Sequence, residues 1–381
     1  MRGDAGNQET SSAYAPSEKT SSPSTTSRRV CLDGRAGGEH DASPSLRQVR
    51  HIGGEMFGKA PVAPRMAVEK SLLAVVFVLS TLTACTRPPA AANGSAPAPR
   101  LMTPDELGAL PSRAPDRRIV YGSEASHYGE LRLPAGVGPH PLVILIHGGC
   151  FKAEYATAQY FGAMADALKS DGIATWNVEY RRLGEPGSGW PGTYLDVGRA
   201  VDHVRAIAGE YRLDLNRVAV VGHSAGGHLA MWTASRHRLP ATSALYVANP
   251  LPVRGAMDLA GPVDMTANIA GYEAICDGPV ITSMLGGTPA AVPDHYAHAS
   301  PIKLLPLGIP QVLVAGSYED NVPIPFLEAY VKAATDAGDP VRLIVIPGAG
   351  HFEIASPLAF TWPPIRSAIR LLVEGKSPSE G

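Results

Sequence analysis

The stretch Val218-Ala-Val-Val-Gly-His-Ser-Ala-Gly-Gly227 runs from an apolar, β-branched segment straight into a Gly-x-Ser-x-Gly pattern. The segment is typical of a buried strand, and the residues from Gly226 onward have the composition of a helix. A turn this sharp leaves no room for bulky side chains two positions from Ser224, and it presents the serine hydroxyl above the strand end. Backbone N–H groups at the start of the helix favour developing negative charge. The stretch therefore predicts that Ser224 is a nucleophile held on a strand-to-helix turn.

The pattern around this stretch indicates an α/β fold with a mostly parallel sheet. From about residue 117, short β-branched runs alternate with amphipathic stretches of roughly 12 to 20 residues. We expect about eight strands, with flanking helices between them. The expected strands cover residues 118–121, 129–133, 142–146, 173–180, 218–221, 254–259, 311–315 and 342–346. The expected helices cover residues 155–170, 195–211, 226–236, 324–337 and 357–374.

One stretch, residues 268–305, breaks this alternation because it is rich in Gly, Pro and Ala. We interpret it as an excursion over the carboxyl edge of the sheet. Loops at that edge commonly form the substrate site of an open α/β sheet. The excursion is therefore expected to supply part of the substrate pocket.

Two later loops carry the groups that a serine nucleophile needs, in the chain order acid and then histidine. The run 311–315 leads into a loop that contains Glu319 and Asp320 and ends Asp-Asn-Val-Pro323. We predict that Asp320 is the acid, with Glu319 as the main alternative because a one-residue shift of the loop would exchange them. The run 342–346 leads into small residues and then His351, which we predict is the general base.

A further loop, His147-Gly-Gly-Cys-Phe151, directly follows the apolar run 142–146. With the Ser224 turn, it resembles the carboxylesterases of the α/β-hydrolase superfamily, over roughly residues 117–373. The resemblance implies a Ser-His-Asp triad and an acyl-enzyme, with no cofactor. It also implies that the oxyanion hole is made by the backbone amides of Gly149, Cys150 and Ala225. His147 is expected to orient the loop through hydrogen bonds.

The stretch Glu179-Tyr-Arg-Arg-Leu-Gly184, with Gly189-Trp-Pro191 and Asp196, is similar to the arylformamidase (kynurenine formamidase) branch of the same superfamily. We interpret Tyr180, Arg181 and Asp196 as a polar cluster that supports the fold. The resemblance itself does not select a substrate.

An esterase for short acyl groups is the expected function, acting on a small ester or amide. The alternatives are an arylformamidase, a prolyl-oligopeptidase-like peptidase and, from a different class, a catalytically silent binding module. A net charge of −2, from 33 basic and 35 acidic residues, argues against nucleic acid as a partner. The sequence contains no metal-binding pattern or phosphate-binding loop, so no cofactor is expected.

The region before the catalytic domain, which we place at residues 116–375, has the layout of an exported lipoprotein. Residues 1–65 are polar and are interpreted as a disordered extension or as the result of a mis-assigned start. Residues 66–85 resemble a signal peptide whose Leu-Thr-Ala-Cys85 ending is similar to a bacterial lipobox.

Cys85 would then carry the lipid and be the membrane anchor, on the periplasmic or cell-surface side. A transmembrane helix or a buried segment is the alternative for this stretch. A flexible tether is expected over residues 86–115 and a flexible tail over 376–381. In an exported domain, Cys150 and Cys276 could form a disulfide, or both could be small buried residues.

Overall fold

The computed structural model describes residues 99–376 of the chain. The predicted extension over 1–65, the signal segment with Cys85, the first part of the tether and residues 377–381 lie outside the described residues. We therefore treat the lipid anchor as a prediction that the fold does not address. No described helix combines the length and apolar character needed to cross a membrane.

The centre of the described region is an eight-stranded sheet in the order β1-β2-β4-β3-β5-β6-β7-β8. β2 pairs antiparallel with β1 and β4, and all the other pairs are parallel. All eight predicted strands are thus present. The strands are β1 (Arg117–Val120), β2 (Tyr128–Arg132), β3 (His140–Ile146), β4 (Ala174–Val178), β5 (Leu213–His223), β6 (Gly255–Leu259), β7 (Gln311–Gly316) and β8 (Val341–Ile346).

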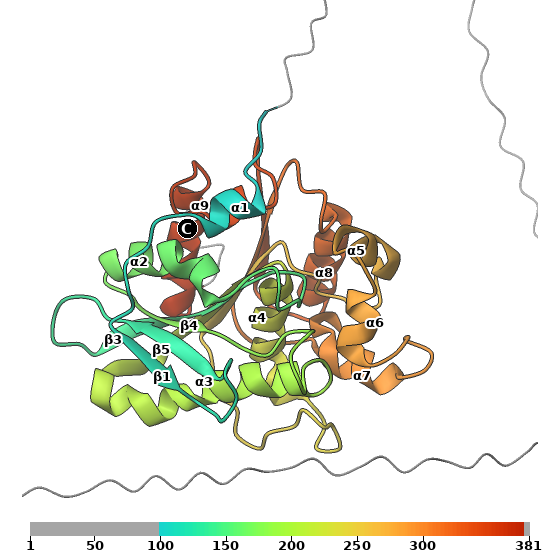
Figure 1. Cartoon of the computed structure of the whole chain (residues 1–381), viewed down its shortest axis with the longest axis horizontal. Helices are drawn as coiled ribbons and strands as arrows, with labels where there is room; N and C mark the ends of the chain where they lie inside the picture. Colours follow the sequence, from blue (N-terminus) through green and yellow to red (C-terminus); the bar gives the residue numbers. More distant parts are fainter. Residues whose placement is uncertain (1–98, 377–381) are drawn as a thin grey trace, which may run out of the picture. The chain divides into compact units, whose positions relative to one another are not determined.

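Helices cover both faces of the sheet, and β3 illustrates why. Leu142, Ile144 and Ile146 point into one core cluster, while Val143 and Leu145 point into the other, because side chains alternate along a strand. Figure 1 shows α2 and α9 on one side of the sheet and α3 on the other. The main helices are α2 (Gly162–Ser170, after the 3-10 turn η1, Ala158–Phe161), α3 (Gly192–Tyr211), α4 (Ala225–Ser235), α8 (Ile324–Asp336) and α9 (Trp362–Val373).

The excursion over residues 268–305 contains more regular structure than its composition indicates. It forms α5 (Ile269–Ile275), α6 (Val280–Leu285), α7 (Pro293–Ala299) and the 3-10 turn η3 (Pro301–Leu304). Gly and Pro residues mark the ends of these short helices rather than an irregular loop: Pro279 precedes α6, and Gly286 follows it with a φ of 76°. In Figure 1, the three helices lie together beside α8.

The predicted tether over residues 86–115 is wrong for its last part, because α1 (Pro104–Gly108) lies within it. Thr103 and Glu106 form a reciprocal capping box at its start, and Pro104 occupies the first turn. Leu107 is buried in the core cluster on the α2 and α9 side. Capping and burial of one apolar side chain therefore order a segment that composition alone predicts to be flexible.

Candidate active site

Ser224 lies between the end of β5 and the start of α4, on the turn that the sequence predicts. Its backbone has a φ of 55° and a ψ of −124°, an unusual conformation for a residue that is not glycine. A Cβ atom on Gly222 would lie 2.0 Å from the carbonyl oxygen of Gly226, and one on Gly226 would lie 2.0 Å from that of Ile146. The glycines are therefore a steric requirement of the turn.

The acid that contacts His351 is Glu319, not Asp320. His351 Nδ1 lies 2.9 Å from both carboxylate oxygens of Glu319, and both side chains are buried. Asp320 is exposed. The prediction that Asp320 is the acid is therefore wrong, and the geometry favours Glu319, the alternative.

The path of the loop after β7 explains why the first acid turns inward. The amide of Glu319 donates to the carbonyl of Gly316, and the carboxylate accepts the amides of Asn321 and Val322 at 2.8 and 3.0 Å. The carboxylate is thereby fixed inside the turn that follows β7. The adjacent side chain, that of Asp320, is left on the outside.

His351 is also held through its backbone, by His223, the residue that precedes Ser224. His223 Nε2 donates to the carbonyl of His351 at 2.8 Å, and Tyr160 donates to His223 Nδ1 at 3.0 Å. Burial, together with the nearby His351, holds the pKa of His223 well below its usual range. A neutral His223 thus fixes the loop that carries His351, a role that the variable position before the serine in Gly-x-Ser-x-Gly does not indicate.

The loop predicted to form the oxyanion hole lies against the Ser224 turn. A Cβ atom on Gly148 would lie 3.1 Å from the Ser224 Cβ, so the loop needs glycine to approach this closely. Gly149 has a φ of 104° and its carbonyl accepts the Lys152 amide. Cys150, Ser224 and Ala225 line one pocket.

Glu179 is a supporting residue of this loop that we did not assign from sequence. Its Oε1 lies 3.2 Å from His147 Nε2 and 3.1 Å from an Arg182 nitrogen. Burial raises the pKa of the Glu179 carboxyl, but His147, Arg182 and the Ala158 amide outweigh burial and lower it overall. The stretch that contains Glu179 resembles that of the arylformamidases, but its position next to His147 follows from the pairing of β4 with β3.

The polar cluster predicted around this stretch is present as a partly buried network. Arg181 Nε and Nη2 lie 2.6 and 2.8 Å from the two carboxylate oxygens of Asp196, and His127 Nε2 lies 2.8 Å from the same carboxylate. The Tyr180 hydroxyl donates to the His147 carbonyl at 2.7 Å. Tyr180 therefore supports the predicted oxyanion loop, while Arg181 and Asp196 join α3 to the end of β4.

The pocket beside Ser224 is small and mostly apolar. Its cavity volume is about 30 Å³, which is enough for about two or three water-sized groups. Cys150 and Cys276 form a disulfide in its wall. The other wall residues come from the predicted oxyanion loop, the loop after β6, the excursion and the loop after β7, and they are Phe151, Pro262, Tyr272, Ile275, Val280, Ile281, Asn321 and Val322.

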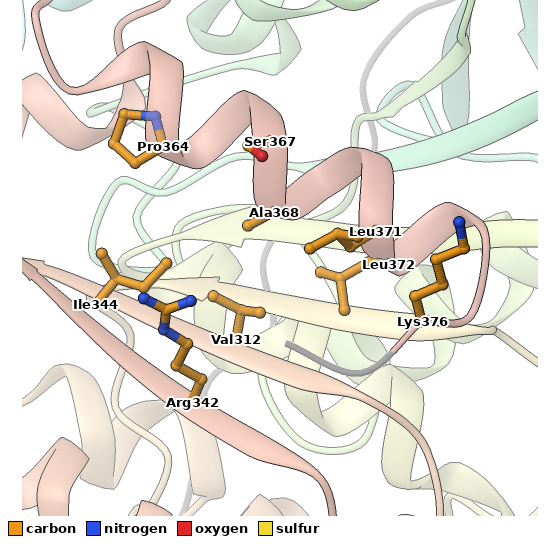
Figure 2. Close-up of a pocket in the computed structure, with 9 residues that line it drawn as sticks. All are labelled: Val312, Arg342, Ile344, Pro364, Ser367, Ala368, Leu371, Leu372 and Lys376. Carbon is orange, nitrogen blue, oxygen red and sulfur yellow. The ribbon is translucent and has the colours of Figure 1, made fainter. Parts of the chain in front are cut away.

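A second hollow lies between α9 and the last two strands, as Figure 2 shows. It is lined by apolar side chains such as Val312, Ile344 and Leu372, with Arg342 and Lys376 beside them. Val312 and Arg342 lie near the amino ends of β7 and β8, whereas the Ser224 turn lies at the carboxyl end of β5. The second hollow is therefore separate from the candidate active site. Among residues 99–376, no group of His, Cys, Asp and Glu side chains is arranged to hold a metal ion.

Comparison with known proteins places this fold among esterases. The chain is similar to the esterase LipC of Mycobacterium tuberculosis, with 27% identity over 67% of this chain and 64% of LipC. It is also similar to the probable carboxylic ester hydrolase LipM of the same organism, with 26% identity over 62% of this chain and 56% of LipM. The chain thus spans less than two thirds of the length of these curated relatives.

Solved structures share the fold. Esterase B from Lactobacillus rhamnosis has a TM-score of 0.58 at 18% identity, over 71% of this chain and 90% of its own. The butyrate-bound esterase Est2 from Thermogutta terrifontis has a TM-score of 0.54 at 18% identity, over 70% of this chain and 96% of its own. These likenesses confirm the predicted α/β-hydrolase fold. The BD-FAE family model matches residues 131–328, just over half of the chain, and the chain therefore belongs to the BD-FAE family.

Proposed function

We propose that this chain is a serine hydrolase that cleaves carboxylic esters with short acyl groups, with Ser224 as the nucleophile, His351 as the base and Glu319 as the acid. The observation that carries the proposal is the fixed His351 ring. Its Nδ1 is occupied by Glu319, which leaves Nε2 as the nitrogen for proton transfer. The esterase relatives and the strained Ser224 turn support the same reading.

The mechanism follows from the roles of these groups. His351 accepts the Ser224 proton while the serine oxygen attacks the ester carbonyl, and Glu319 stabilises the imidazolium that forms. The amides of Gly149, Cys150 and Ala225 are the proposed donors to the oxyanion. The alcohol leaves with a proton from His351, and water then releases the acid from the acyl-enzyme.

The short-acyl preference rests on the pocket beside Ser224. A cavity of about 30 Å³, walled by Tyr272 and Ile281, has room for only a few non-hydrogen atoms. A long acyl chain would need these walls to move, whereas an acetyl group would not.

The first test is hydrolysis of p-nitrophenyl acetate, p-nitrophenyl octanoate, N-formylkynurenine and an Ala-Pro anilide by the full-length chain, with Ser224→Ala as the control. We expect turnover of the acetate that the Ser224→Ala variant lacks. Fastest turnover of N-formylkynurenine or of the anilide would replace the ester proposal with a formamidase or a peptidase. Absence of turnover and of serine labelling by a fluorophosphonate would favour a binding module.

We further propose that the chain is exported and anchored through a lipid on Cys85. The support is the order of Lys70, an apolar run and Leu-Thr-Ala-Cys85, followed by a segment rich in Ala and Pro. Intact-mass analysis of the membrane fraction tests this proposal. A chain that begins at Cys85 with added acyl mass is expected, and an uncleaved, unmodified Cys85 would overturn it.

A further inference from the structure

The disulfide joins two parts of the active site that are far apart in sequence. Cys150 belongs to the proposed oxyanion loop, and Cys276 directly follows α5 in the excursion, 126 residues later. Both cysteines line the pocket beside Ser224. The bond therefore connects a proposed amide donor to the segment of the excursion that lines the same pocket.

The backbone at Cys150 is in a conformation that its side chain disfavours. Cys150 has a φ of 52° and Phe151 a φ of 57°, both in the left-handed region that glycine adopts far more readily. Such a conformation persists only where surrounding contacts enforce it. On one side, the Phe151 carbonyl accepts the Leu183 amide at 2.7 Å. On the other side, the disulfide is the covalent constraint.

The turn after α5 is held to the same loop by a second contact. Lys152 Nζ donates to the Asp277 carbonyl at 2.9 Å, one residue beyond Cys276. This contact is a single hydrogen bond from a flexible side chain. The disulfide is consequently the stiffer of the two links between α5 and the oxyanion loop.

We propose that Cys276 is a positioning residue for catalysis: through its bond to Cys150 it holds the Cys150 N–H in the oxyanion hole. The inference rests on the proposed function, since it concerns the same site. Loss of the bond would let the Cys150 backbone leave its left-handed conformation and carry the amide away from the oxyanion. The main effect would be on kcat, because the oxyanion forms after substrate binds.

A matched pair of variants separates this role from simple cross-linking. Cys150→Ala/Cys276→Ser and Cys150→Gly/Cys276→Ser both lack the bond and differ only in the Cβ at residue 150. A cross-link that only stabilises the fold would lower the melting temperature of both and change their kcat alike. A positioning role makes the alanine variant slower, because glycine adopts the required conformation without the bond.

The measurement is kcat and KM for p-nitrophenyl acetate with full-length wild type and both variants, well below their melting temperatures. Removal of an oxyanion donor costs about 10²- to 10³-fold in kcat, so a misplaced one is expected to cost about tenfold. We expect the kcat of the alanine variant to fall about tenfold below wild type, while its KM stays within about threefold of the wild-type value. We expect the kcat of the glycine variant to be at least about threefold higher than that of the alanine variant. Equal kcat values for the two folded variants would overturn the proposal.

Reduction of the wild-type chain gives a second test that does not depend on the variants folding. Dithiothreitol converts the bond to two thiols and closes to its own cyclic disulfide, and iodoacetamide mass mapping shows when Cys150 and Cys276 are free. We expect kcat to fall about tenfold with this exposure, as for a misplaced oxyanion donor. Unchanged kcat with both thiols free would overturn the proposal.

The remaining cysteines and the parent proposal are controlled separately. The Cys150→Ala/Cys276→Ser variant retains Cys31 and Cys85 and is expected to be insensitive to the reductant. An oxidised wild type without Ser224-dependent hydrolysis would be a failure of the proposed function. Ser224-dependent hydrolysis whose kcat is unchanged after reduction would be a failure of the disulfide inference alone.

Discussion

His351 Nδ1 lies 2.9 Å from each of the two carboxylate oxygens of Glu319. Both side chains are buried, whereas the next acid along the chain, Asp320, is exposed. A carboxylate in this position fixes the tautomer and the orientation of the imidazole. The relationship therefore assigns different roles to two adjacent acids that a sequence pattern cannot separate.

Glu319→Gln is expected to lower kcat by about 10³- to 10⁴-fold on p-nitrophenyl acetate, because an amide favours the wrong histidine tautomer. Asp320→Asn is the matched control, and its kcat is expected to stay within about twofold of wild type, as for an exposed residue with no contact to the base. Steady-state kinetics with circular dichroism to verify folding provides the comparison. A large loss in Asp320→Asn with full activity in Glu319→Gln would restore the acid chosen from sequence.

The sequence predicts the frame of this site well because steric demands fix its residues. The turn at Ser224 cannot accept a Cβ at Gly222 or Gly226, so the glycine spacing itself indicates the geometry. Strands β3 and β7 are likewise apparent from apolar runs that are buried along nearly their whole length.

The parts that the sequence did not predict depend on hydrogen bonds within one turn or on contacts between distant segments. Glu319 rather than Asp320 faces His351 because two amides, Asn321 and Val322, hold its carboxylate inward. Glu179 reaches His147 only because β4 pairs with β3. Pairing of Cys150 with Cys276 requires the end of α5 to lie beside the predicted oxyanion loop, and no periodicity in the sequence indicates this placement.

Ile281→Ala is expected to widen the pocket beside Ser224 and shift selectivity towards longer acyl chains. Ile281 is 1% exposed and lines the pocket. Its truncation removes part of the wall, so methylenes of the octanoyl chain can enter the pocket. Each methylene that becomes buried there is worth about 0.8 kcal/mol. Burial of two would raise the octanoate-to-acetate ratio of kcat/KM about tenfold.

Ile275→Ala serves as the control for pocket size because Ile275 lines the same pocket but is 44% exposed. Its octanoate-to-acetate ratio is expected to remain within about twofold of wild type, since little buried volume is lost. Parallel measurement of kcat/KM on acetate, butanoate and octanoate esters makes the comparison. An unchanged ratio in Ile281→Ala would mean that this wall does not limit the acyl group.

His228 is expected to make the fold less stable as the pH falls. It is buried in α4, where its Nδ1 donates to the Pro262 carbonyl and its Nε2 accepts the Tyr194 hydroxyl, both at 2.8 Å. Burial lowers the pKa of His228 to about 4, although its hydrogen bond to Pro262 acts in the opposite direction. Unfolding returns the side chain to water and to an ordinary pKa near 6.5.

Between these two pKa values the unfolded chain binds a proton that the folded chain does not. The neutral buried His228 therefore contributes stability above pH 6.5, and this contribution is lost progressively as the pH falls towards 4, by about 2 kcal/mol at pH 5. His228→Gln keeps a donor and an acceptor without a titrating group. Thermal denaturation at pH 7.5 and pH 5 is expected to show a larger drop in melting temperature for wild type than for His228→Gln. Because His223 is also held neutral by burial, the variant retains part of the drop, and only equal drops in the two proteins would contradict the assignment to His228.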